Sequence, residues 1–296
     1  MPYDTAVACV EEADRALLLA HVLGKDRAWL VAHGNEIVLA PEEQRTYDAF
    51  LARRMRGEPL AYIVGEAWFY GRRFEVTNDV LVPRPETEHL VDAALAFLRA
   101  FVENDRGCPI VLDVGTGSGA IACTIAAEVP QAIVYATERS QAALRIALRN
   151  AKNLVAPSTA FASRTTLGIT ERRTALGVSA EFADLLPADA ALRFDCVVAN
   201  LPYIPSADVP SKPDPVGFEP REATDGGPDG LHEYRRLLEA LPPRISAGGL
   251  VLLETAPPTA RALAELAMKA FPNARATISR DYAGRERLVA IEVPSL

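Results

Sequence analysis

An asparagine followed by Leu-Pro-Tyr closes an apolar run at residues 197–205, VVANLPYIP. The run is typical of a buried strand, and an asparagine at its end has a side-chain amide that must find hydrogen-bond partners. A proline two residues later ends the ladder because it has no N–H to donate. The pattern fits a plain turn, and it also fits a pocket for a planar group that carries an NH2. The pocket residues would be Asn200, Leu201, Pro202 and Tyr203.

A glycine-rich turn lies earlier in the chain, in VLDVGTGSGAIA at residues 111–122. Gly115, Gly117 and Gly119 allow a tight strand-to-helix turn and the close approach of a ligand. Two ligand classes fit. One is a dinucleotide with its pyrophosphate at the helix N-terminus, and the other is S-adenosylmethionine with Asp113 under its amine. A turn without any ligand is the third possibility.

Two acids follow the next strands. Glu138 ends IVYATE, where a carboxylate can accept both ribose hydroxyls of a nucleoside, or can simply be a helix N-terminal acid. Asp184, in EFADLL, is placed to receive the exocyclic amine of adenine while Leu185 packs on the ring. A turn or helix-capping role is equally compatible with Asp184.

The position of Asn200 joins these observations into one reaction. It follows the fourth strand, beside the first, where the strand order of doubly wound sheets reverses and ligands bind. A sulfonium methyl donor on the glycine turn would point its methyl group here. The Asn200 side-chain oxygen and the Leu201 main-chain oxygen would hold the acceptor NH2, with the Tyr203 ring against its planar group. Positioning is then the main source of catalysis.

The elements that must position these residues alternate as in an α/β protein. From residue 109 onward strands and helices follow one another, which predicts a doubly wound, Rossmann-like parallel sheet. The last two strands, 274–283 and 286–293, are close in sequence, so we expect one to run antiparallel at the edge. Residues 3–60 predict helices ending at glycines, and residues 67–83 a hairpin. Residues 155–178 fit no regular element and receive no role.

Composition limits the partners. The chain has 296 residues, a net charge of -8 and a pI near 5.2, which argues against broad contact with a phosphate backbone. Its four cysteines are spaced too widely for a metal site, so we expect free buried thiols and no metal: Cys9, Cys108, Cys123 and Cys196. The start has no basic segment typical of a signal peptide, and no apolar stretch is long enough for a membrane span. We therefore expect a cytoplasmic protein.

Several blocks together resemble the HemK/PrmC family, the protein-(glutamine-N5) methyltransferases of peptide-chain release factors. These are GEPLAYIVGEAWFYGRRFEVTNDVLVPRPETE (57–88), LDVGTGSGAIA (112–122), EPREATDGGPDGLHEYRRLL (219–238) and DYAGRERLV (281–289). The likeness covers nearly the whole chain. It implies S-adenosylmethionine as methyl donor, S-adenosylhomocysteine as product, and the glutamine of a Gly-Gly-Gln loop as acceptor.

The resemblance also assigns residues and domains. It gives cofactor binding to Asp113, Gly115, Thr116, Gly117, Ser118, Gly119, Glu138, Asp184, Leu185 and Asn200. It gives catalysis and substrate binding to Asn200, Leu201, Pro202 and Tyr203, with Arg84 and Pro85 also at the substrate. The domains would be a helical bundle at 1–62 that binds the release factor, a hairpin linker at 63–85, and the methyltransferase domain at 86–296. We expect a monomer without a stable nucleic-acid or membrane partner.

Three features depart from the family pattern. Leu201 replaces the first proline of its Asn-Pro-Pro-Tyr motif, Glu138 stands where an aspartate is frequent, and residues 155–178 are an insertion. Two other functions stay open. One is methylation of an amino group on a nucleic-acid base, and the other is binding of release factor or cofactor without turnover. A dehydrogenase is less favoured because it leaves the PRPETE and NLPY stretches without a role.

Overall fold

The computed structural model describes residues 10–33, 36–154, 163–166, 169–173 and 178–295. The chain divides into two compact units. The first comprises Met1–Glu66 together with Pro210–Glu219, and the second comprises Ala67–Val209 together with Pro220–Leu296. Each unit is described by itself below. No helix in these described ranges combines the length and apolar character that crossing a membrane requires.

The first unit is helical, as the sequence predicts. Its helices are α2 (Glu12–Leu23), α3 (Arg27–His33), α4 (Pro41–Met55) and α5 (Leu60–Val64). Leu18, Leu51 and Ile63 form its small buried core. The segment 210–219, with η3 (Pro215–Phe218), packs on Gly57, where a Cβ atom would lie 1.8 Å from the Pro213 carbonyl oxygen. Residues 3–9, 34 and 35 of the predicted helical region lie outside the described residues.

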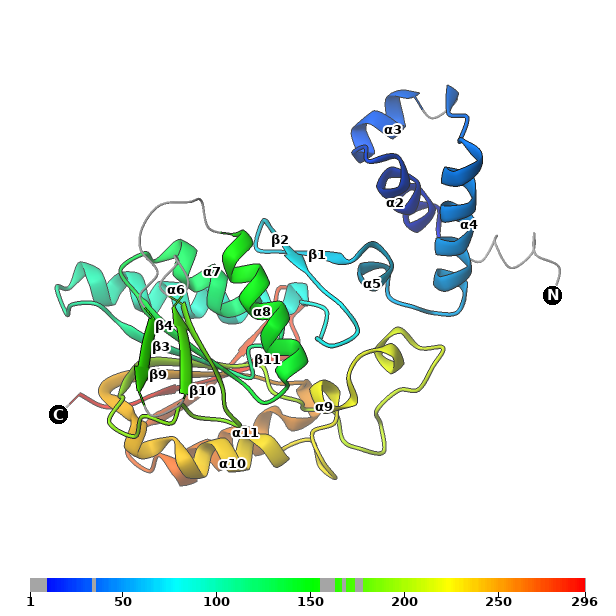
Figure 1. Ribbon diagram of the computed structural model, residues 1–296. Coiled ribbons are helices and arrows are strands. Elements are labelled where there is room, and N and C mark those ends of the chain that lie inside the picture. The colour runs from blue at the N-terminus through cyan, green and yellow to red at the C-terminus, as the bar shows by residue number, and fades with distance from the viewer. Residues whose placement is uncertain (1–9, 34–35, 155–162, 167–168, 174–177, 296) are drawn as a thin grey trace. The chain divides into compact units, whose positions relative to one another are not determined.

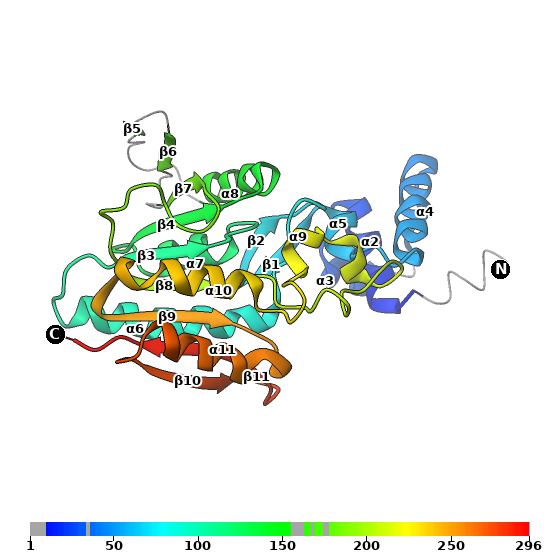
Figure 2. The same ribbon diagram turned by 90° about the horizontal axis from the view of Figure 1, so that it is seen from below.

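The second unit is built on one sheet (Figure 1), whose strand order is β10-β11-β9-β8-β3-β4-β7-β6-β5 (Figure 2). Strands β9, β8, β3, β4 and β7 run parallel, and the remaining neighbours pair antiparallel. The bounds are β3 (Ile110–Val114), β4 (Ile133–Glu138), β5 (Ser163–Thr166), β6 (Ile169–Arg173), β7 (Val178–Phe182), β8 (Phe194–Ala199), β9 (Ile245–Glu254), β10 (Arg275–Arg280) and β11 (Glu286–Glu292).

Helices cover both faces of this sheet (Figures 1 and 2). One face packs against α6 (Glu88–Glu103), α7 (Ala120–Glu128) and α8 (Gln141–Asn153), and the other against α10 (His232–Ala240) and α11 (Pro257–Ala270). Successive residues of β3 alternate between the two cores, since Val111 belongs to the first and Leu112 to the second. This arrangement confirms the doubly wound α/β fold.

A short hairpin precedes the sheet. Strands β1 (Glu66–Phe69) and β2 (Arg72–Glu75) form it, and it buries Phe69 and Phe74. The Tyr70 N–H donates to Glu88 at the start of α6, and its hydroxyl donates to Asp92. These contacts fix the segment between the hairpin and α6, which includes η2 (Pro85–Thr87).

Three expectations need correction. The antiparallel strand β11 lies between β9 and β10, not at the edge, and its buried Leu288, Val289 and Ile291 pack into the cores on the two faces of the sheet. Part of the insertion, unassigned from sequence, forms β5 and β6 beyond β7. Cys123 and Cys196 are free and buried, but Cys108 is exposed. Cys9 lies outside the described residues.

Candidate active site

A cavity lies where β3, β4, β7 and β8 end, within the second unit. Most of the sequence-predicted site residues line it: Arg84, Gly115, Thr116, Gly117, Ser118, Glu138, Asp184, Leu185, Asn200, Leu201 and Pro202. Four others, within the described part of the chain, do not line it: Pro85, Asp113, Gly119 and Tyr203. The cavity therefore brings together the glycine turn, both acids and the asparagine, as expected at the point where the strand order reverses.

The glycines of the turn have separate structural reasons. Gly115 has φ +70°, and a Cβ atom there would lie 2.9 Å from Cδ2 of Leu201. Gly119 lets α7 approach α8, since its Cβ would lie 3.2 Å from Ala147. At Gly117, with φ +55°, the nearest atom to an added Cβ is 4.0 Å away. The space beside Gly117 is thus open for a ligand that approaches the backbone closely.

Asp113 supports the turn from below. Its side chain is fully buried, and Oδ2 accepts hydrogen bonds from the Thr116 hydroxyl at 2.6 Å and the Ala122 N–H at 3.1 Å. Burial raises the pKa of Asp113 to about 7, against the lowering effect of these two bonds. Its carboxyl group therefore holds the loop in place and does not itself face the cavity.

Glu138 faces the cavity at the end of β4. Its two oxygens accept from the backbone N–H groups of Gly117 at 2.9 Å and Ser140 at 2.8 Å. Burial raises its pKa, and the two backbone bonds lower it. Because each carboxylate oxygen has a second lone pair, Glu138 can still accept two hydroxyl groups from a ligand.

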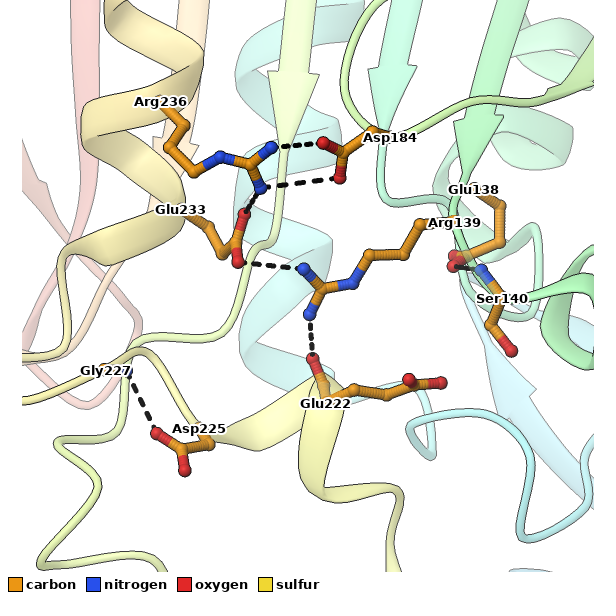
Figure 3. Close-up of polar contacts among 9 residues, drawn as sticks. All are labelled: Glu138, Arg139, Ser140, Asp184, Glu222, Asp225, Gly227, Glu233 and Arg236. Carbon is orange, nitrogen blue, oxygen red and sulfur yellow. Dashed lines mark hydrogen bonds and ion pairs between the residues drawn. The ribbon is translucent and has the colours of Figure 1, made fainter.

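Asp184 lies two residues beyond the end of β7 and is joined to an ion-pair chain across the cavity (Figure 3). Arg236 of α10 binds Asp184 and also Glu233, the latter at 2.8 Å. Glu233 in turn binds Arg139 at 2.8 Å, and Arg139 donates to the carbonyl oxygen of Glu222 at 3.0 Å. Charges of alternating sign thus border the cavity next to Asp184.

Asn200 directly follows β8. Its side-chain nitrogen donates to the hydroxyl of Thr87, at the end of η2, at 3.1 Å. The next residue, Leu201, is buried, and its N–H donates to the Tyr234 hydroxyl at 3.1 Å. The Tyr203 hydroxyl is 3.4 Å from Oε1 of Glu254, and burial raises the pKa of Tyr203.

The glycine-rich block at 225–230 supports this loop. A Cβ atom at Gly226 would lie 2.6 Å from the carbonyl oxygen of Pro202, and one at Gly230 would lie 2.3 Å from that of Tyr203. Ile204 pairs with this block through its carbonyl oxygen, which accepts a hydrogen bond from the Gly226 N–H at 2.8 Å. Only glycine permits such close backbone contact, which explains the DGGPDG pattern.

Sequence reasoning assigned no role to five residues that the structure brings to the site: Thr87, Arg139, Glu233, Tyr234 and Glu254. A signal existed for Glu254, because a lone acid ends the apolar run of β9 beside the strand that leads to Asn200. Tyr234 and Glu233 lie in a helix whose amphipathic pattern does not distinguish a core residue from a site residue.

Comparison with known proteins identifies the family. Residues 10–65 match the model of the PrmC N-terminal domain, and residues 87–179 match the methyltransferase small domain. The release factor glutamine methyltransferase of Bordetella pertussis is 38% identical and aligns with 92% of this chain and 91% of its own length. That of Cereibacter sphaeroides is 38% identical, with 98% and 95% covered.

A solved structure supports the fold alone. A methyltransferase from Pyrococcus furiosus matches with a TM-score of 0.50 and 17% identity, over 76% of this chain and 91% of its own. The identity and coverage of the curated relatives decide the family. This chain belongs to the release factor glutamine methyltransferases.

Proposed function

We propose that this chain transfers a methyl group from S-adenosylmethionine to the side-chain amide nitrogen of the glutamine in the Gly-Gly-Gln loop of a peptide-chain release factor. The observation that carries the proposal is the position of Asn200 and Leu201 in one cavity with the glycine turn and Glu138. The family, whose named members are release factor glutamine methyltransferases, supports the same acceptor.

The residues of the cavity fit the methyl donor. The open space beside Gly117 accepts a ligand against the loop backbone, and Glu138 has lone pairs for two ribose hydroxyls. Asp184 and Leu185 would hold the adenine ring by its amine and its face. S-adenosylmethionine supplies an electrophilic methyl group on a sulfonium, which is the chemistry the acceptor needs.

The acceptor amide would be held by two oxygens. An amide NH2 has two hydrogens, and the Asn200 Oδ1 and the Leu201 main-chain oxygen can accept one each. A bond forms between the amide nitrogen and the methyl carbon, the carbon–sulfur bond breaks, and its electron pair stays on sulfur. The nitrogen then loses one proton to water, so no strong base is needed. Alignment of nitrogen, carbon and sulfur supplies the rate.

Other parts of the chain would bind the release factor. Arg84 lines the cavity, and Pro85 follows it at the start of η2, so both would contact the segment that carries the glutamine. Residues 1–62 would hold the body of the release factor, in agreement with the match of residues 10–65 to the PrmC N-terminal domain. The domain ranges 1–62, 63–85 and 86–296 remain part of this proposal.

A transfer assay tests the acceptor. Labelled S-adenosylmethionine is incubated with the protein and one acceptor at a time. The acceptors are a purified release factor, the same factor with its Gly-Gly-Gln glutamine changed to alanine, bulk RNA, and bulk DNA. The proposal predicts label on the intact factor alone, and loss of label by about 10²-fold with Asn200→Ala. Label on RNA or DNA would instead support base methylation, and bound cofactor without any transfer would support a binding protein.

A further inference from the structure

We propose that Tyr234 is a positioning residue of the acceptor site, which acts by fixing the main chain of Leu201. The inference rests on the proposed function, because it concerns the oxygen that would hold the glutamine amide. Tyr234 lies on α10, is fully buried, and directs its hydroxyl to the turn after β8.

Three main-chain atoms surround this hydroxyl. It accepts a hydrogen bond from the Leu201 N–H at 3.1 Å, and it donates to the carbonyl oxygen of Glu254 at the end of β9. The carbonyl oxygen of Leu201 is also close, at 3.3 Å. The hydroxyl thus ties the turn after β8 to the end of the neighbouring strand.

The number of protons decides which oxygen stays free. A phenol has one proton, and two carbonyl oxygens compete for it. We assign the proton to the Glu254 oxygen, which the hydroxyl approaches more closely than the Leu201 oxygen. The Leu201 oxygen therefore keeps its capacity to accept a hydrogen from the substrate amide, while the Leu201 N–H is held by the phenol oxygen.

Leu201 makes this support necessary. Its N–H is buried, and a buried N–H without a partner is costly, so the peptide would turn to find one. Such a turn would move the Asn200 carbonyl of the same peptide and, through the Leu201 Cα, the Leu201 carbonyl that would hold the acceptor. A proline at position 201 would have no N–H to satisfy, so the requirement for the Tyr234 hydroxyl depends on the residue present at 201.

The ionisation of Tyr234 does not interfere with this role. Burial, with the nearby Glu254 charge, raises its pKa well above the usual range of a phenol. The hydroxyl is thus neutral and keeps its proton throughout the physiological range of pH. The contribution of Tyr234 is expected to be independent of pH, unlike that of a general acid or base.

A double-mutant cycle tests the proposal. Tyr234→Phe removes only the hydroxyl. Leu201→Pro removes the N–H from which this hydroxyl accepts and also replaces the leucine side chain, so the comparison is made between the two backgrounds. Methyl transfer to a release factor is measured for both single variants and the double variant at saturating S-adenosylmethionine. Tyr70→Phe is the matched control, since it removes a tyrosine hydroxyl that binds Asp92 outside the cavity.

We expect Tyr234→Phe to lower kcat roughly tenfold, with little change in the Kd for S-adenosylmethionine. In the Leu201→Pro background, the same substitution should lower kcat by less than about threefold. Equal losses in the two backgrounds, or a kcat for Tyr234→Phe equal to that of Tyr70→Phe, would overturn the proposal. A lower melting temperature with unchanged kcat would show that the role is structural only.

Amide hydrogen exchange gives a readout that does not need a substrate. The Leu201 N–H should exchange at least about tenfold faster in Tyr234→Phe than in the wild type and in Tyr70→Phe. Unchanged exchange would show that this hydrogen bond is absent and would overturn the proposal even if the wild type methylates release factor. If the Leu201 N–H is protected in the wild type but the wild type transfers no methyl group to release factor, the proposed function is refuted. The role of Tyr234 in the acceptor site is then refuted with it.

Discussion

The side-chain nitrogen of Asn200 lies 3.1 Å from the hydroxyl oxygen of Thr87. The Thr87 hydroxyl also lowers the pKa of the Glu254 carboxyl group, to which it is placed to donate. When Glu254 is ionised it can only accept, so the Thr87 proton is then directed to Glu254 and the Thr87 oxygen is left to accept from Asn200. The asparagine amide must then present its NH2 to Thr87, which leaves Oδ1 for another donor. Thr87 is part of PRPETE, which gives this stretch a role in orienting the site.

Removal of the Thr87 hydroxyl should therefore slow transfer. Thr87→Val keeps the shape of the side chain but lets the Asn200 amide rotate, so kcat should fall about tenfold at an unchanged Kd for S-adenosylmethionine. Thr87→Ser keeps the hydroxyl and should retain most of the activity. Steady-state kinetics on both variants checks this, and equal behaviour of the valine and serine variants would rule it out.

Gly115 should tolerate alanine less well than other left-handed glycines. Gly284 has φ +77° and no atom within 4 Å of an added Cβ, so Gly284→Ala measures backbone strain alone, about 1 kcal/mol. Gly115→Ala adds a contact of 2.9 Å with Cδ2 of the buried Leu201 side chain, which must shift, and should lower the free energy of unfolding by more than Gly284→Ala does.

Urea unfolding of both variants measures the difference. Leu201→Ala removes the atom that the new methyl group meets, so it should reduce the additional cost of Gly115→Ala. If Gly115→Ala costs no more than Gly284→Ala, the close contact between Gly115 and Leu201 does not exist in solution.

Asp184 should contribute more to the affinity for S-adenosylmethionine than Asp229, which also pairs with an arginine of α10. Asp184→Ala should weaken binding of S-adenosylmethionine about five- to tenfold, because the adenine amine loses its acceptor. Asp229 pairs with Arg235 at similar exposure, and neither is among the residues that line the described cavity. Asp229→Ala should change the Kd by less than about twofold.

Arg236→Ala distinguishes two explanations for weaker cofactor binding in Asp184→Ala. One is the loss of the adenine acceptor, and the other is the loss of the ion pair with Arg236. If Asp184 binds adenine, removal of its partner Arg236 should leave most of the affinity. Isothermal titration of the three variants decides the matter. Equal losses in Asp184→Ala and Arg236→Ala would mean that the ion pair, and not the acid, is what the cofactor site requires.

Glu254 should make stability depend on pH. Burial raises its pKa from 4.5 to about 7, the nearby Glu86 raises it further, and Thr87, Arg287 and Tyr203 lower it. The folded state therefore binds this proton more tightly than the unfolded state. Its contribution to stability is greatest below about pH 4.5 and is lost as pH rises through about 7, by on the order of 3 kcal/mol.

Glu254→Gln cannot titrate and should flatten the dependence. Asp113, whose pKa is also raised to about 7 by burial, changes stability in the same direction, so only the difference between variant and wild type isolates Glu254. The free energy of unfolding is measured from pH 5 to pH 8, with the exposed Glu265→Gln as control. If the curves for wild type and Glu254→Gln are parallel, folding does not raise the pKa of Glu254.

Much of the fold follows from local sequence. The parallel strands are apolar runs between turn signals, and the helices carry their own stop signals, such as Gly24 after α2. The position of β11 inside the sheet could not be predicted, because two adjacent strands can be added in either order. Strands β5 and β6 could not be predicted either, since their serine, threonine and arginine content gives no apolar alternation.

Some residues of the site could likewise be predicted from the sequence, and others could not. Residues at strand ends, such as Glu138 and Asn200, could be predicted because parallel strands bring their carboxyl ends to one edge. Thr87 and Tyr234 could not, since their contacts with the turn after β8 join positions 113 and 33 residues apart. The sequence predicts Asp113 under the ligand amine, but it does not show how deeply the turn buries this side chain, which is fully buried and does not line the cavity.

The most direct test of the account is to locate the transferred methyl group. The release factor is incubated with the protein and S-adenosylmethionine, digested, and its Gly-Gly-Gln peptide fragmented in a mass spectrometer. The account predicts a mass increase of one methylene on the glutamine side-chain amide, and none when Asn200 is changed to alanine. A methyl group on another residue, or an unmodified peptide beside methylated RNA or DNA, would contradict the assignment of Asn200 and Leu201 to the glutamine amide.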